Sequence, residues 1–232
     1  MKYLLAATFA LGLSASWASA SVITLDFEDV NATYPSGFAF VNGFYNGGIS
    51  SDGTTGTNFG IEFSDNAQAI CLNSTTVSCS NTSRGGEGNP NSQQGGLFFL
   101  EGAETFMNVA AGFQIGFSFF YSAVNEGGSI SVYDGLNGTG NLLASLILGT
   151  TPSGDCGDYG AGFCPFVASG IGFLGTAQSV SFGGVANQIV FDDVTFGSVT
   201  PDPTSPIPLP ASLPLLLAGL GGLGLMARRK RR

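Results

Sequence analysis

The 232-residue sequence contains no histidine and few basic residues. Lys2 and a C-terminal cluster account for all basic residues except Arg84. Serine–histidine and cysteine–histidine mechanisms are therefore excluded, because both need an imidazole base. One arginine and sixteen acidic residues give residues 21–205 a net charge of 1 − 16 = −15. Such a charge repels the phosphate backbone, so we exclude nucleic acid as a partner.

Sixteen carboxylates leave one catalytic class open, which is the cleavage of a glycan by a pair of acidic residues. Their spacing selects no pair, and acidic side chains are also what keeps a protein surface soluble. We therefore predict that the protein is not an enzyme. A carboxylate-dependent glycan hydrolase or lyase is the alternative.

The first 20 residues have the layout of a secretory signal peptide. Lys2 precedes an apolar stretch over residues 3–13, and Ala18 and Ala20 form a small-x-small cleavage site. The apolar stretch is too short to remain as a membrane-spanning helix. The sequence thus predicts export, with Ser21 as the first residue of the mature protein.

Residues 21–198 have the pattern of a single all-β domain. Short runs of alternating apolar and polar residues are separated by segments rich in glycine, asparagine, aspartate and serine. The predicted strands are 22–27, 60–63, 97–100, 113–120, 129–133, 142–148, 180–182 and 188–196, with a β-hairpin over 129–148. We expect a β-sandwich with jelly-roll-like connectivity, followed by an extended proline-rich spacer over residues 199–206.

The four cysteines form two pairs with equal spacing, Cys71 with Cys79 and Cys156 with Cys164. An exported protein reaches an oxidising compartment, where such pairs form local disulfides. A zinc site is disfavoured because this spacing is unusual for zinc ligands and no histidine is present. The sequence predicts two disulfides and leaves the other two connectivities open.

Acidic residues cluster near both ends of the domain. Asp26, Glu28 and Asp29 belong to the first strand-like region, and Asp192 and Asp193 belong to the last. If these strands pair, the carboxylates could converge on one Ca²⁺, which takes six to eight oxygen ligands. This placement resembles the structural calcium site of carbohydrate-binding jelly-roll modules. The alternative is a solvated acidic strand face, since successive side chains alternate between faces.

Carbohydrate binding requires exposed aromatic rings with polar neighbours. Residues 34–45 are the strongest candidate segment, because five aromatic residues lie there among glycine and asparagine. Packing in the core is the alternative for most of these rings. The candidates are Tyr34, Phe38, Phe40, Phe44, Tyr45, Tyr121, Tyr133 and Tyr159.

Residues 207–232 combine a proline motif, an apolar segment and a basic end. The motif is Ile207-Pro208-Leu209-Pro210-Ala211, and the basic end is Arg228-Arg229-Lys230-Arg231-Arg232. A helix over residues 213–227 would reach only about 22 Å, whereas a hydrocarbon core is about 30 Å thick. The basic residues stay on the cytoplasmic side, so the domain would face outward. An ordinary membrane anchor is the alternative.

This three-part order resembles the PEP-CTERM class of bacterial sorting signals. The motif resembles the VPLPA-CTERM variant, with Ile207 in place of valine. The resemblance implies processing by an exosortase, a membrane cysteine transpeptidase that cleaves near the motif. Members of the class are often associated with exopolysaccharide and biofilm matrix. We therefore expect transient anchoring in the inner membrane through the C-terminal helix. The mature product would be a surface or secreted protein that is structural or binds polysaccharide.

Overall fold

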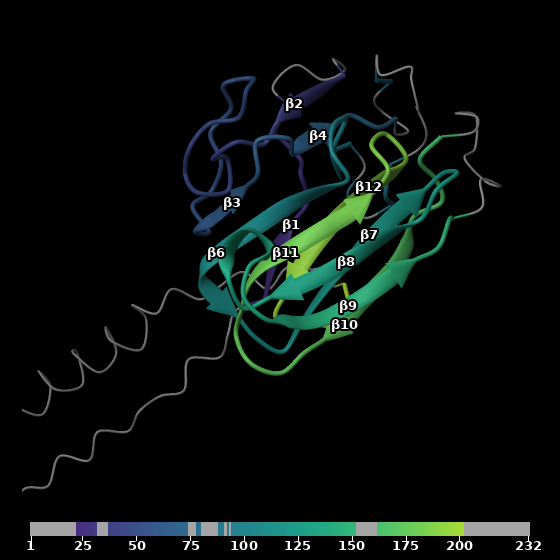
Figure 1. Ribbon diagram of the computed structural model, residues 1–232. Coiled ribbons are helices and arrows are strands. Elements are labelled where there is room, and N and C mark those ends of the chain that lie inside the picture. Colours follow the sequence, from purple (N-terminus) through teal and green to yellow (C-terminus); the bar gives the residue numbers. More distant parts are fainter. Residues whose placement is uncertain are drawn as a thin grey trace, which may run out of the picture.

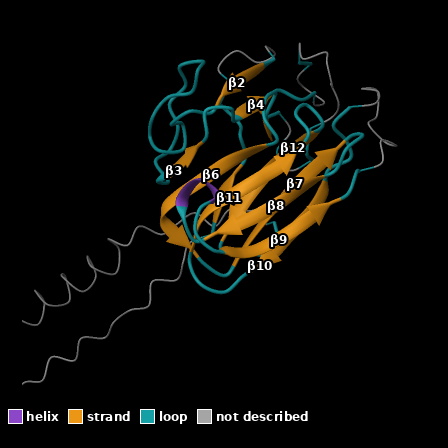
Figure 2. Cartoon of the chain, viewed as in Figure 1, coloured by secondary structure: helices purple, strands orange, loops and turns teal. Residues whose placement is uncertain are grey.

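The computed structural model describes residues 22–31, 37–73, 78–79, 88–90, 92, 94–151 and 162–201. These residues form an all-β domain of two antiparallel sheets (Figures 1 and 2). This confirms the predicted all-β class and the sandwich. None of the helices in the described part is long and apolar enough to cross a membrane. The predicted signal peptide and sorting tail lie outside the described residues.

The larger sheet has the strand order β10-β7-β12-β5-β4-β2, and β1 also pairs with β12. Its strands are β1 Ile23–Leu25, β2 Phe38–Phe40, β4 Gln68–Ile70, β5 Leu97–Phe98, β7 Gly116–Ala123, β10 Val167–Gly172 and β12 Ile189–Phe196. In the β1–β12 pair, Ile23 lies opposite Phe196 and Leu25 opposite Val194. The predicted pairing of the first and last strands is thus confirmed. It places the two acidic segments beside each other.

The smaller sheet has the order β3-β6-β11-β8-β9. Its strands are β3 Ile61–Phe63, β6 Glu104–Phe113, β8 Gly128–Tyr133, β9 Leu142–Leu148 and β11 Ala177–Gly184. Strands β8 and β9 form the predicted hairpin, and their turn contains the short 3₁₀ helix η1, Leu136–Gly138. Asn137 has φ 53° there, a conformation that asparagine tolerates better than most residues.

One predicted strand, 113–120, is divided by a turn. Strand β6 ends at Phe113 and β7 begins at Gly116, and Ile115 between them has φ 79°. The apolar alternation hides this turn because both flanking strands carry inward phenylalanines. Strands β2, β4 and β10 were not predicted, and neither was β6 apart from its last residue, Phe113. Strands β2 and β4 have only three residues each, and β10 contains two glycines, so none of these three gives a clear period. Strand β6 gives a mixed pattern because its buried side carries Thr105 and its other side Phe106.

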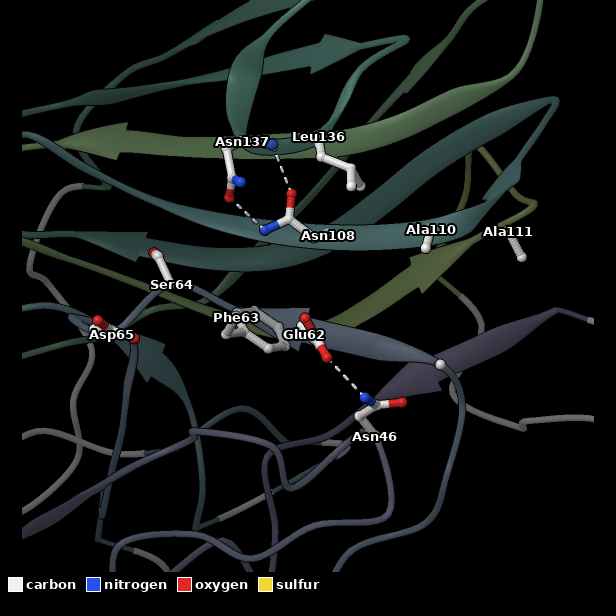
Figure 3. A pocket seen from close by; sticks show the side chains of 11 residues that line it. Asn46, Glu62, Phe63, Ser64, Asp65, Asn108, Ala110, Ala111, Leu136 and Asn137 are labelled. Carbon is white, nitrogen blue, oxygen red and sulfur yellow. Dashed lines mark hydrogen bonds between the residues drawn. The ribbon is translucent and has the colours of Figure 1, made fainter.

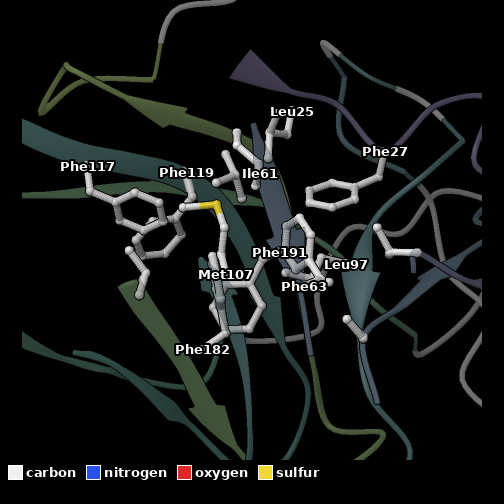
Figure 4. Packing of buried hydrophobic residues seen from close by; sticks show 14 of the residues in the cluster. Leu25, Phe27, Ile61, Phe63, Leu97, Met107, Phe117, Phe119, Phe182 and Phe191 are labelled. Atoms are coloured by element: carbon white, nitrogen blue, oxygen red, sulfur yellow. The ribbon is translucent and has the colours of Figure 1, made fainter. Parts of the chain in front are cut away.

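Phenylalanine fills the space between the sheets, as the composition predicts (Figure 4). Phe191 of β12 lies edge-on to Phe182 of β11, with ring centroids 4.9 Å apart, and 5.7 Å from Phe119 of β7. Such edge-to-face pairs contribute about 0.5–1.5 kcal/mol beyond the burial of area. Because rings from both sheets meet here, one core joins the two layers.

Candidate functional site

Several predicted site residues lie outside the described part of the chain. They are Ala18, Ala20, Tyr34, Cys156, Tyr159, Ile207 to Ala211 and Arg228 to Arg232. Among the described cysteines, Cys71 and Cys79 form the predicted disulfide, with their Cα atoms 5.8 Å apart. Cys164 is also disulfide-bonded. Both observations fit an oxidising compartment.

A groove of about 480 Å³ lies beside the edge strand β2. Phe38 and Phe40 are 46% and 41% exposed, whereas Ala39 between them is buried. Since side chains alternate along a strand, both rings project from the same face. The residues that line this β2 groove are Phe38, Phe40, Asp65, Asn66, Gln68, Leu100 and Glu101.

The polar side chains of the β2 groove differ in how they are bonded. Asn66 is fixed, because its Nδ2 donates to the carbonyl oxygens of Glu101 (3.0 Å) and Glu104 (2.9 Å). Gln68 lies opposite Phe40 in the β2–β4 pair and is 5% exposed. Its Oε1 accepts no hydrogen bond from any described residue. The groove therefore combines two exposed rings with one buried acceptor that has no hydrogen-bond partner among the described residues.

Of the other candidate rings, three are buried in the core, and the fourth is half-buried on β8. The buried ones are Phe44, Tyr45 and Tyr121, and the half-buried one is Tyr133. Tyr45 has a structural role, because its hydroxyl oxygen accepts a hydrogen bond from the Phe27 N–H at 2.9 Å. The aromatic segment thus splits, with Phe38 and Phe40 outside and its later rings inside. The two-residue spacing of Phe38 and Phe40 indicates that a strand here would place both rings on one face, but it does not indicate which face is exposed.

A second pocket, of about 600 Å³, lies over β3, β6 and the β8–β9 turn (Figure 3). Its amides bond one another: Asn108 Nδ2 donates to Asn137 Oδ1 at 2.8 Å, and Asn137 N donates to Asn108 Oδ1 at 2.7 Å. Asn46 Nδ2 likewise donates to Glu62 Oε1 at 2.8 Å. Phe63 is buried, so the described lining contains no exposed aromatic ring. This amide pocket therefore lacks a stacking platform.

The two acidic segments meet at the β1–β12 pair, where β12 carries a β-bulge. The register with β7 shifts between Asp192 and Thr195, and Asp193 has φ 46°. A bulge re-aims side chains locally. Both Asp192 and Asp193 are buried, as is every other residue of β12 on either face of the strand.

Burial and mutual repulsion raise the pKa values in this acidic cluster. The pKa of Asp192 lies well above its usual value because of burial and, next, the charge of Asp193. Burial followed by the charge of Asp26 raises the pKa of Asp193 to about 6. Burial also raises the pKa of Asp26, and the Glu28 N–H, which donates to Asp26 Oδ1, partly offsets that rise. Each shift reflects the cost of removing a carboxylate from water.

The carboxylates of the cluster are largely engaged with the protein itself. Glu28 Oε1 accepts the N–H groups of Gln94 (2.7 Å) and Gly95 (2.8 Å). Asp193 Oδ2 accepts from Asn89 Nδ2 at 2.9 Å. Asp192 Oδ2 is fully buried and has no hydrogen-bond partner among the described residues.

No three Asp, Glu, Cys or His side chains of the described segments form a group that could hold a metal ion. The predicted ligands Asp26, Glu28, Asp192 and Asp193 come together at the β1–β12 pair without forming such a group. Calcium binding stays a prediction.

The chain matches no protein-family model and no curated protein sequence. Three solved structures show a partial likeness. One is a glycoside hydrolase family 43 arabinoxylan arabinofuranohydrolase from Bacillus subtilis, in complex with cellotetraose. It is 20% identical with a TM-score of 0.32, and the match covers 47% of this chain and 22% of the hydrolase. This chain thus spans about a fifth of the length of that enzyme.

The other two are carbohydrate-binding modules of family 6. One is 19% identical with a TM-score of 0.31, and covers 50% of this chain and 83% of the module. The second is the C-terminal module of the laminarinase LamC from Zobellia galactanivorans. It is 11% identical with a TM-score of 0.30, and covers 50% of this chain and 90% of the module. Likeness at this level does not identify a shared function, so the function is argued from the site.

Proposed function

We propose that the protein is an exported, non-enzymatic module that binds polysaccharide in the β2 groove. The observation that carries this proposal is the pair of exposed rings, Phe38 and Phe40, beside the buried, unpartnered acceptor of Gln68. Ligand sites typically combine apolar or aromatic surface with a few placed polar groups. Sugar rings meet both needs, because their C–H faces stack on phenyl rings while their hydroxyls donate hydrogen bonds.

The charge of the groove points to a neutral glycan. Asp65 and Glu101 line the groove, and no lysine or arginine occurs among the described residues. A uronate or sulfate group would therefore enter a field of its own sign without a cation to pair with. Neutral glucans or similar polymers meet no such repulsion.

One observation favours the alternative, a carboxylate-dependent hydrolase or lyase. Asp65 and Glu101 line the same groove, as a pair of catalytic carboxylates would. Both side chains are exposed, however, whereas a catalytic general acid is usually kept protonated by burial. The buried carboxyls with raised pKa values lie in the cluster at β1 and β12. Binding without cleavage is thus the better-supported activity.

The proposal is tested by titrating the protein with a panel of neutral and anionic glycans by calorimetry. We expect a neutral polymer to bind, and Phe38→Ala and Phe40→Ala each to weaken binding about tenfold or more, as loss of an aromatic anchor does. Leu174→Ala is the matched control, because Leu174 is 91% exposed and lies outside the groove. New reducing ends or unsaturated products that disappear in Asp65→Asn or Glu101→Gln would support the enzyme instead.

We also propose that residues 1–20 and 207–232 direct export, transient membrane anchoring and exosortase processing. The disulfide of Cys71 and Cys79 supports an oxidising destination. The strand sets β1-β12-β7-β10 and β6-β11-β8-β9 support the jelly-roll assignment of the exported domain. Intact mass of the mature protein from its native host tests the processing. A retained C-terminus would leave the tail as an ordinary anchor.

A further inference from the structure

Two long edge strands lie on one flank of the sandwich. Strands β9 and β10 end the smaller and the larger sheet, and they contact each other (Figure 1). They have seven and six residues, whereas the opposite edge strands β2 and β3 have three each. A long edge strand presents unpaired backbone N–H and C=O groups to any other strand. We call the side formed by β9 and β10 the charge-free flank.

This flank lacks the features that normally protect an edge. Proteins block long edge strands with proline, or with lysine and other charged side chains. Strand β9, with the sequence LLASLIL, has none of these. Ile147 is 81% exposed and Leu142 is 54% exposed. Among the described residues, 135–151 and 162–191 contain no charged side chain. The opposite edge strand β3, by contrast, carries the exposed Glu62 at its centre.

Of the two strands, β9 is the more accessible. The chain that follows β12 passes over β10, where a Cβ added to Gly170 would collide with the carbonyl oxygen of Val199. Val167, the apolar residue at the start of β10, is 42% exposed, about half the exposure of Ile147. The open edge of the molecule is therefore β9.

We propose that β9 pairs antiparallel with β9 of a second copy of this chain. Every charged side chain of the described residues is acidic, so two copies repel each other wherever these carboxylates meet. The charge-free flank is the side on which they approach most easily. A strand paired antiparallel with itself also forms a closed two-fold interface. The result is a dimer with a continuous sheet across the two copies.

Charges at the ends of β9 give the interface a characteristic salt dependence. Asp134 accepts the N–H of Asn141 just before β9, and Glu126 lies in the turn before Gly128, which pairs with Leu148. Antiparallel pairing brings the Asp134 of one copy toward the Glu126 of the other. Salt screens this repulsion, so the dimer tightens as salt rises, unlike a dimer held by ion pairs.

A dimer would also present two β2 grooves to one polymer, which raises avidity without new contacts. This consequence rests on the proposed function, whereas the dimer itself does not. Sedimentation and glycan titration therefore fail or succeed independently.

The first test is sedimentation of the full-length protein in a neutral detergent. We expect wild type and Leu174→Lys to be dimers and Ile147→Lys to dissociate at least about tenfold more readily, because a lysine on an edge strand opposes edge-to-edge pairing. Leu174 is the matched control, since it is 91% exposed on the turn after β10. All three proteins keep the same tail, so association through the tail would persist in Ile147→Lys. A monomeric wild type, or equal behaviour of the two variants, overturns the proposal.

Cross-linking gives a second readout that is specific for the strand. Ser145 is the exposed central residue of β9, and residues opposite each other in an antiparallel pair have Cβ atoms about 4.5–5.5 Å apart. Mild oxidation should therefore link Ser145→Cys into a covalent dimer, while Ser169→Cys on β10 stays unlinked. Equal cross-linking of both variants, or of neither, contradicts pairing through β9.

Discussion

Two regions of the molecule depart from the usual distribution of side chains in opposite ways. They are the acidic cluster at β1 and β12 and the charge-free flank at β9 and β10. The cluster buries Asp192 and Asp193, which are costly to desolvate, and the flank exposes Leu142 and Ile147, which are usually buried. Both features occur in the same sandwich and around the same core. Both departures are tolerated because the phenylalanine core joins the two sheets. We expect a proton or an ion to compensate for the buried carboxyls, and a second copy of the chain to cover the exposed apolar residues.

The largest expected effect tests whether the two regions belong to one cooperative unit. Phe191→Ala removes a ring that packs between Phe119 and Phe182, and should lower the free energy of unfolding by about 3–5 kcal/mol. Because this core joins both sheets, we expect a single unfolding transition at lower denaturant. Circular dichroism in urea measures it.

Phe40→Ala is the control for Phe191→Ala, since the Phe40 ring is 41% exposed and should contribute less than about 1 kcal/mol. Two separate transitions in Phe191→Ala would show that the acidic cluster and the flank unfold independently, and the comparison between them would lose its common scaffold.

A smaller effect concerns pH. A carboxyl whose pKa is higher in the folded state than in the unfolded state stabilises the fold while it is protonated. This contribution is fully present below the pKa of the unfolded state and is lost as pH rises through the pKa of the folded state. The rise of the Asp193 pKa from 3.8 to about 6 corresponds to a contribution of about 3 kcal/mol to the free energy of unfolding. The free energy of unfolding should therefore fall between about pH 4 and pH 7, the raised pKa of Asp192 should add to this fall as pH rises, and Asp192→Asn should flatten the curve.

Asp134, in the turn just before β9, provides a control because its pKa is shifted in the opposite direction. The Asn141 amide, which donates to Asp134, lowers the pKa of that carboxyl. The stabilising contribution of Asp134 is therefore present above its pKa in the unfolded state and is lost as pH falls. Asp134→Asn should thus leave the loss of stability above about pH 4 unchanged. If it abolishes that loss, the acidic cluster is not the cause.

The same variants test the predicted calcium. If Asp26, Glu28, Asp192 and Asp193 bind Ca²⁺, about 1 mM calcium should raise the melting temperature of the wild type near neutral pH and have little effect on Asp192→Asn. Equal response of both proteins, or of neither, removes the calcium prediction and leaves the cluster as a group that binds protons.

Much of the fold could be predicted because the strands that matter most have strong local signals. The alternation in Ile189–Phe196 and the turn residues after Tyr133 predict β12 and the β8–β9 hairpin. Strands β2 and β4 were missed because three residues carry no period. They form only because neighbours in space complete their hydrogen bonds.

The site was harder to predict than the fold. The sequence suggested the rings of residues 34–45, but only pairing with β4 shows that Phe38 and Phe40 face outward beside Gln68. Gln68 was not a candidate, since nothing local marks a glutamine whose acceptor will be buried. The acidic cluster could be predicted from one assumption, the pairing of β1 with β12. The bulge at Asp193 could not, because it depends on the register with β7.

The smallest expected effect lies in the turn that leads into β9. Asn137 combines φ 53° with two hydrogen bonds to Asn108, so Asn137→Ala should lower the free energy of unfolding by about 1–2 kcal/mol. Asn137→Gly keeps the backbone conformation and the backbone N–H bond, and should cost less than alanine. Urea unfolding ranks the three proteins. Alanine and glycine variants of equal stability would show that the amide contact, and not the backbone, holds the turn from which the open edge strand begins.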